Sequence, residues 1–167
     1  TPFKVFTPFW RNAEQKYLSL PPSKNYIVKK KNKMISFFKK CIEPENILPK
    51  ENWYKKFEDY WKVSENDSKK ILSNLIDNKI IEYGVARDYP SIEGTSKLSP
   101  YIKHGQIHVN TIWKKCNDTK SKGIGYRKYI NELGWREFSH SLINYFPEFL
   151  KGNYRKEFDK FPWVKNE

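Results

Sequence analysis

A short polar segment at residues 95–100 gathers three hydroxyl side chains just before the predicted start of a helix. The hydroxyls belong to Thr95, Ser96 and Ser99. Ser99 followed by Pro100 is typical of a helix N-terminus, where Ser is a frequent N-cap and Pro is tolerated in the first turn. Unpaired backbone N–H groups and the partial positive charge at a helix start bind anions such as phosphate. The segment therefore predicts either a phosphate-binding loop or a capped helix that binds nothing.

A second candidate lies on a long helix predicted near the C-terminus. Glu132, Trp135 and Arg136 stand at positions i, i+3 and i+4, so they share one helix face. A carboxylate, a flat indole and a guanidinium there could accept a hydrogen bond from a nucleobase, stack on it and hold a phosphate. The alternative is a Glu132–Arg136 ion pair beside a packed Trp. The other side of this helix is expected to be buried; it holds Leu133, Phe138, Leu142 and Tyr145.

Other kinds of site are not supported by the residue pattern. The Gly-Ile-Gly run at residues 123–125 does not follow a predicted strand, so it does not indicate dinucleotide binding. No P-loop and no Ser nucleophile motif is present. The side chains that could ligate a metal show no ligand spacing; they are His104, His108, His140, Cys41 and Cys116.

Composition indicates a basic protein with many flat side chains. The 167 residues contain 32 Lys+Arg and 19 Asp+Glu, a net charge of +13, and 17% are aromatic. Such a surface suits polyanions and flat rings. No apolar run approaches the roughly 20 residues of a membrane span, so we expect no membrane association. Two cysteines do not make a disulfide framework, which favours a reducing, cytoplasmic setting. The chain does not begin with Met, so we expect Thr1 to be a cut end.

The spacing of apolar residues predicts an all-α fold that begins with an irregular segment. Prolines recur through residues 1–50, which are expected to be linker-like. Short amphipathic stretches are possible at residues 12–20 and 35–42. The lysine-rich run at residues 29–33 predicts a solvated loop or, alternatively, a patch that steers phosphates.

Helical spacing dominates from residue 51 onward. Trp53, Phe57 and Trp61 are four apart and predict an aromatic stripe that belongs to the core. Ser64 predicts the cap of the next helix, whose apolar face holds Ile71, Leu72, Leu75, Ile76 and Ile80. Residues 83–99 predict a loop. Further helices are expected at about residues 99–105, 109–116, 123–146 and 154–160.

Several of these segments together resemble the DNA photolyase and cryptochrome family, in family order and with family spacing. Phe-Thr-Pro-Phe-Trp-Arg-Asn at residues 6–12 resembles the entry to the family's helical domain. Tyr83, Arg-Asp-Tyr-Pro at residues 87–90 and Gly-Thr-Ser-Lys-Leu-Ser-Pro-Tyr at residues 94–101 resemble its flavin-phosphate loop. Glu-Leu-Gly-Trp-Arg-Glu-Phe at residues 132–138 resembles its lesion-facing helix, and Phe-Pro-Trp at residues 161–163 the segment downstream. The likeness is nearest to the bacterial class I photolyases of cyclobutane pyrimidine dimers.

The resemblance implies light-driven repair of cyclobutane pyrimidine dimers in DNA by an electron from reduced FAD. Carried over by position, Arg87 would contact the DNA backbone, Glu132 would hydrogen-bond the flipped dimer and Trp135 would stack on it. The FAD, chiefly its phosphates, would be held by Tyr83, Thr95, Ser96, Leu98, Ser99 and Arg136.

The resemblance also implies a domain arrangement. Residues 1–50 would correspond to an interdomain linker and residues 51–167 to the first part of the FAD-binding helical domain. On this resemblance, we expect the family's antenna domain and C-terminal part to be absent, so the antenna chromophore is not indicated. We expect the fragment to be monomeric and, alone, neither to bind FAD tightly nor to repair DNA. Tyr129 stands where many relatives have a tryptophan near the flavin.

Two other functions fit the sequence. A cryptochrome-type blue-light sensor would keep the fold and the FAD without repair, although Glu132 and Trp135 favour a repair enzyme. A basic helical module that binds nucleic acid without catalysis would also explain the charge of +13 and the aromatic content.

Overall fold

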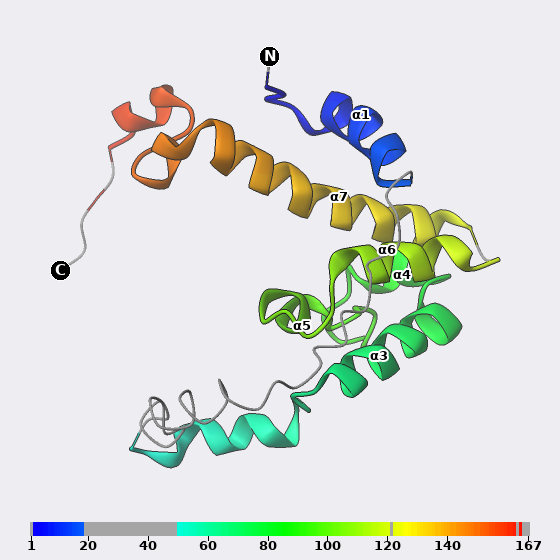
Figure 1. The fold of residues 1–167 in the computed structure, drawn as a ribbon. Coiled ribbons are helices and arrows are strands. Elements are labelled where there is room, and N and C mark those ends of the chain that lie inside the picture. The colour runs from blue at the N-terminus through cyan, green and yellow to red at the C-terminus, as the bar shows by residue number, and fades with distance from the viewer. Residues whose placement is uncertain (1, 19–49, 121, 163, 165–167) are drawn as a thin grey trace, which may run out of the picture.

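The structure, a computed structural model, describes residues 2–18, 50–120, 122–162 and 164, and within these ranges its regular elements are helices (Figure 1). The all-α prediction is confirmed. The amphipathic stretch expected at residues 35–42, the lysine-rich run and Cys41 lie outside the described residues. Among the described helices, none combines the length and the apolar character that crossing a bilayer requires.

The 22-residue helix α7 (Ile124–Tyr145) is the element on which the other helices are assembled. It contacts α1 (Phe6–Leu18), α4 (Tyr83–Ala86) and α6 (Val109–Asp118). Figure 1 shows α1 running beside α7, while α4 and α6 lie on the side that faces α3 and α5. Seven residues of α7 are buried, which suits a helix packed on more than one side.

Helix α1 lies against α7 at unusually close range. A Cβ atom on Gly134 would come within 2.6 Å of the Trp10 ring, so only glycine leaves room for the buried indole. The Trp10 indole N–H donates to Asn131 Oδ1 at 3.1 Å. Further along, Arg127 pairs with Glu14 at 2.8 Å. A ring, a hydrogen bond and an ion pair therefore hold one helix to the other.

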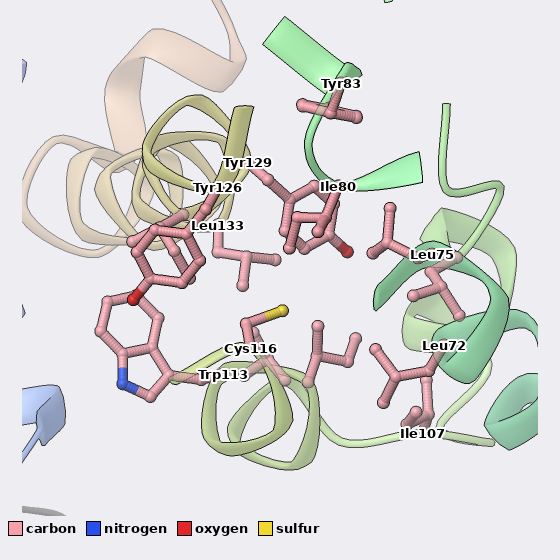
Figure 2. Close-up of a cluster of buried hydrophobic side chains, with 14 of the residues drawn as sticks. Leu72, Leu75, Ile80, Tyr83, Ile107, Trp113, Cys116, Tyr126, Tyr129 and Leu133 are labelled. Carbon is pink, nitrogen blue, oxygen red and sulfur yellow. The ribbon is translucent and has the colours of Figure 1, made fainter. Parts of the chain in front are cut away.

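The main core forms between α7, α6 and the helix that begins at Glu65. Ser64 caps α3 (Glu65–Asn74) as predicted, because its hydroxyl accepts from Asp67 N at 3.0 Å. The helix continues as the π-helical segment η3 (Leu75–Lys79). Figure 2 shows side chains from the three elements pointing toward one another; those buried include Leu72, Leu75, Ile80, Trp113, Cys116, Tyr129 and Leu133.

The aromatic stripe near residue 53 is not part of the core, which corrects the prediction. Trp53 and Phe57 are 59% and 56% exposed, whereas Trp61 packs partly against the core. Their segment is the 3-10 helix η2 (Asn52–Asp59). A 3-10 helix has three residues per turn, so residues four apart do not align along one face as they would in an α-helix.

Three further boundaries differ from those predicted. Helix α1 begins at Phe6, within the segment expected to be irregular, because Pro8 lies in the first turn, where its missing N–H costs nothing. The predicted loop at residues 83–99 begins with the single helical turn α4. Helix α5 (Ser99–Lys103) has Leu98 as its N-cap, so Ser99 is its first residue and not its cap.

Toward the C-terminus the helices are short. Helix α7 ends at Tyr145, as the following Pro147 predicts. The 3-10 helix η4 (Pro147–Leu150) contacts α7, and η5 (Lys156–Lys160) occupies part of the last predicted helix. Tyr145 itself is 59% exposed, so its predicted burial is wrong, whereas Leu133 and Phe138 are buried as expected.

Candidate functional site

One open pocket lies between α7, α4 and the segment at residues 95–100, which we call the hydroxyl loop. Its volume is about 570 Å³. Residues from the hydroxyl loop line one side, and Glu132 and Arg136 from α7 line another. All six residues to which the resemblance assigned FAD contacts line this one pocket; they are Tyr83, Thr95, Ser96, Leu98, Ser99 and Arg136.

The hydroxyl loop has a defined backbone shape. Leu98 is buried and anchors the loop in the core, and its N–H donates to Ser96 Oγ at 3.3 Å. Lys97 has φ = +54°, a left-handed conformation that is uncommon for a residue with a Cβ. Its ammonium group pairs with Glu93. The backbone carbonyl of Glu93 also accepts a hydrogen bond from Lys79 Nζ at 2.7 Å. This bond ties η3 to the segment just before the hydroxyl loop.

Helix α5 contributes less than the sequence predicted. It has five residues, and Leu98, its N-cap, makes no side-chain cap hydrogen bond. Gly105, at φ = +72°, follows the end of the helix as expected. The Tyr101 hydroxyl donates to the carbonyl of Lys62 at 2.7 Å and so ties α5 to the segment after η2. The groups of this pocket that could bind an anion are therefore side-chain hydroxyls and cations, and not a long helix dipole.

Two buried tyrosines form part of the pocket wall. The rings of Tyr83 and Tyr129 meet edge to face with centroids 5.0 Å apart, and both are buried. Burial raises the pKa of the Tyr129 phenol, and a hydrogen bond with Ser96 partly opposes that rise. The Tyr83 pKa is raised by burial as well. Both rings therefore stay neutral at physiological pH and give the pocket an apolar wall beside its hydroxyl-lined side.

Glu132 and Arg136 of α7 do not pair with each other. Glu132 pairs with Arg87, and Arg136 pairs with Glu137. The Glu132–Arg136 pair offered as the alternative for this face is thus replaced by two others. The bond to Glu132 raises the pKa of Arg87, whose guanidinium also lies 5.5 Å from the Tyr83 ring centroid. Arg87 does not line the pocket; it lies at its border through this ion pair.

Trp135 lies outside the pocket lining, next to Arg136. Its indole stacks on Phe6 of α1, with centroids 3.9 Å apart and an interplanar angle of 10°. The residue keeps 46% of its surface exposed. Residues i and i+1 differ by 100° around a helix, so α7 directs Arg136 into the pocket and Trp135 toward α1. The single face predicted for Glu132, Trp135 and Arg136 is therefore two adjacent faces.

Several lining residues were not among the predicted site residues. They are Trp61, Lys97, Ile102, Tyr129 and Leu133. One available signal would have found two of them, because Tyr129, Glu132, Leu133 and Arg136 follow the i, i+3, i+4, i+7 spacing of one helix face. Trp61 and Ile102 come from other parts of the chain, and their position depends on the fold.

His108 and Cys116 each contribute to the structure, whereas His104 and His140 are exposed. His108 Nδ1 accepts from Asn110 N at 3.1 Å and caps α6. Cys116 is fully buried, and burial raises its pKa to about 12. Among the residues that the structure describes, no three His, Cys, Asp or Glu side chains are grouped so that they could hold a metal ion.

Comparisons with known proteins give relatives that are photolyases by name. The chain is 31% identical to a deoxyribodipyrimidine photo-lyase of Agrobacterium fabrum over 99% of its own length and 35% of the relative. It is 28% identical to one of Alkalihalophilus pseudofirmus over 89% of its length and 30% of the relative. The chain therefore spans about a third of these curated relatives. No family model matches the sequence.

A solved structure agrees with these relatives. The crystal structure of a bacterial class III photolyase from Agrobacterium tumefaciens matches with a TM-score of 0.71 and 28% identity, over 98% of this chain and 34% of that one. That protein is a class III photolyase, while the class I likeness of this chain stays a prediction. Sequence and fold thus agree across nearly all of the chain, and the protein belongs to the photolyase family.

Proposed function

We propose that the chain provides part of an enzyme that repairs cyclobutane pyrimidine dimers in DNA with light, and that its pocket holds FAD. The relatives' name, deoxyribodipyrimidine photo-lyase, supports the reaction class. The observation that carries the proposal is the convergence of Tyr83, the hydroxyl loop and Arg136 on one pocket of about 570 Å³. Bound FAD, once reduced and excited by light, would supply the electron that splits the dimer.

The side chains of the pocket fit a flavin dinucleotide in two respects. Three hydroxyls and the Arg136 guanidinium are donors suited to a diphosphate, and Lys97 adds a cation at the same rim. The neutral tyrosine wall offers flat apolar surface to a ring system. In this arrangement the hydroxyl loop binds and orients the phosphates, while Tyr83 and Tyr129 exclude water from the inner side.

The neighbouring residues fit a lesion in DNA. Glu132 lines the same pocket and could accept hydrogen bonds from the polar edge of a flipped dimer. Trp135, half-exposed one residue from Arg136, offers a stacking surface. Arg87, at the border, could contact a phosphate of the DNA backbone. Cofactor and substrate would then lie on adjacent faces of one helix, which keeps the distance for electron transfer short.

Flavin binding tests the cofactor half of the proposal. We expect FAD to bind the chain weakly, with a change in flavin fluorescence, and we expect ADP to displace it better than riboflavin, because the hydroxyl loop holds the phosphates. Ser96→Ala combined with Arg136→Ala should weaken FAD binding about tenfold or more, since each removes a donor to a charged group.

The matched control is Arg155→Ala, which removes an exposed arginine that lines a different cavity, near Phe146. It should leave FAD binding unchanged. Equal loss in the control and in the double variant, or displacement by riboflavin but not by ADP, would contradict the assignment of the phosphates to the hydroxyl loop. DNA binding with no flavin binding at all would favour a nucleic-acid-binding module instead.

A further inference from the structure

We infer that Phe6 is a positioning residue for Trp135: its ring fixes the plane of the indole, so that the opposite face is presented to a flat base. The inference rests on the proposed function, in which Trp135 stacks on the lesion. It assigns a role to a residue of α1 that lies 129 positions away in the sequence and outside the pocket.

The contact itself is tight and nearly parallel. The rings of Phe6 and Trp135 have centroids 3.9 Å apart and an interplanar angle of 10°, so one face of the indole is covered. Phe138 meets the indole at a steep angle, with centroids 5.8 Å apart and planes at 72°. A stacked ring on one side and an edge contact on another leave the indole little freedom to tilt.

The Phe6 ring is itself held from several directions. It lies 6.1 Å from Trp10 in a nearly parallel arrangement and 6.0 Å from Phe138 at 71°. Trp10 is buried against Gly134 and bonded to Asn131, both on α7. The position of Phe6 is therefore set by the same contacts that hold α1 to α7.

The energetic consequence concerns the exposed part of Trp135, which amounts to 46% of the residue. A free indole side chain loses rotamer freedom when it stacks on a ligand, and this loss opposes binding. An indole already held by Phe6 loses less. Phe6 should therefore increase the affinity for a stacked lesion without touching it, while binding to undamaged DNA depends mainly on phosphate contacts.

A spectroscopic experiment tests the positioning directly. The chain is labelled with 5-fluorotryptophan, and the Trp135 resonance is assigned by its loss in Trp135→Phe. Phe6→Leu keeps an apolar side chain but removes the flat ring, so we expect the Trp135 resonance to shift and broaden. Phe6→Tyr restores a flat ring and should restore a narrow signal near the original position. A Trp135 resonance that Phe6→Leu leaves unchanged would overturn the inference.

A binding experiment tests the consequence for the lesion. The preference of each variant for an oligonucleotide with a thymine dimer over the undamaged oligonucleotide is measured at one salt concentration. Trp135→Ala should lower this preference about tenfold, as expected for one lost base stack. Phe6→Leu should lower it part of the way, and Phe6→Tyr should recover it.

The control is Phe3→Ala, because Phe3 contacts Phe9 of the same segment, with centroids 6.1 Å apart. It should change neither the Trp135 resonance nor the dimer preference. If Trp135→Ala lowers the preference and Phe6→Leu does not, the inference is overturned and the proposed function stands. If Trp135→Ala affects both oligonucleotides equally, the proposed stacking role fails and the inference fails with it.

Discussion

At the scale of single residues, the site depends on which partner each charged side chain finds. The sequence correctly indicated Glu132 and Arg136 as neighbours on a helix, but the structure pairs Glu132 with Arg87. That partner is 45 positions earlier and reaches α7 only because α4 packs against it. Helical spacing specifies which residues share a face, whereas the choice of an ion partner depends on tertiary packing.

The hydroxyl loop was more predictable, for a local reason. Ser, Thr and Pro near a helix start have strong conformational preferences of their own, so residues 95–100 could be recognised in isolation. Tyr129 was recognised only as a departure from the family, because a buried tyrosine on an apolar helix face does not differ in pattern from any core residue.

Cys116 gives a prediction at this scale. Burial raises its pKa to about 12, so the folded protein keeps the thiol protonated at pH 8, and the thiolate is the reactive form. In a Cys41→Ser background, we expect maleimide to leave Cys116 unmodified in native protein and to modify it in guanidinium chloride, as mass spectrometry would show. Rapid native modification at pH 8 would contradict the buried position.

At the scale of elements, prediction succeeded where a helix carries its own signals. Ser64 and the apolar residues after it specify α3, and Pro147 marks the end of α7. It failed for Trp53 and Phe57, because large aromatic residues indicate a core only if another element covers them. It also failed at Phe6, where Pro8 was taken as a helix breaker although the first turn accepts proline.

The close contact between α1 and α7 leaves no room for a side chain at position 134. A Cβ at position 134 would lie 2.6 Å from the Trp10 ring, which must then move. We expect Gly134→Ala to lower the free energy of unfolding by about 1–3 kcal/mol, as overpacking does. Urea denaturation followed by circular dichroism would measure it.

Gly152→Ala is the control for that substitution. At this position a Cβ would meet only the flexible end of Lys156, at 3.6 Å, so stability should change by less than about 0.5 kcal/mol. A Gly134→Ala variant as stable as the wild type would show that α1 does not approach α7 as closely as described.

At the scale of the whole molecule, charge and resemblance lead to the same kind of partner. The chain carries a net charge of +13, and the relatives it matches are named as enzymes of pyrimidine dimers. A protein that binds DNA through Lys and Arg displaces counterions from phosphates. Neither the net charge nor the likeness gives the relative positions of the side chains, and the structure supplies them by bringing residues distant in the sequence to one pocket.

The corresponding prediction concerns salt. We expect the logarithm of the affinity for duplex DNA to fall linearly with the logarithm of the salt concentration, by about 0.9 for each phosphate neutralised. Fluorescence anisotropy with a labelled oligonucleotide would measure the slope. An affinity that does not change between low and high salt would show that the positive charge is not used to bind DNA.

The ion pair between Arg87 and Glu132 has a consequence for recognition. A hydrogen-bond donor on a base that binds Oε1 of Glu132 would compete with the Arg87 guanidinium for that oxygen. An arginine displaced in this way would keep Asp88 beside its Nε at 3.5 Å, while its terminal nitrogens could turn to a nearby phosphate. Recognition of a base by Glu132 and binding of a phosphate by Arg87 would thus be coupled. A base without a suitable donor would leave Glu132 and Arg87 paired with each other.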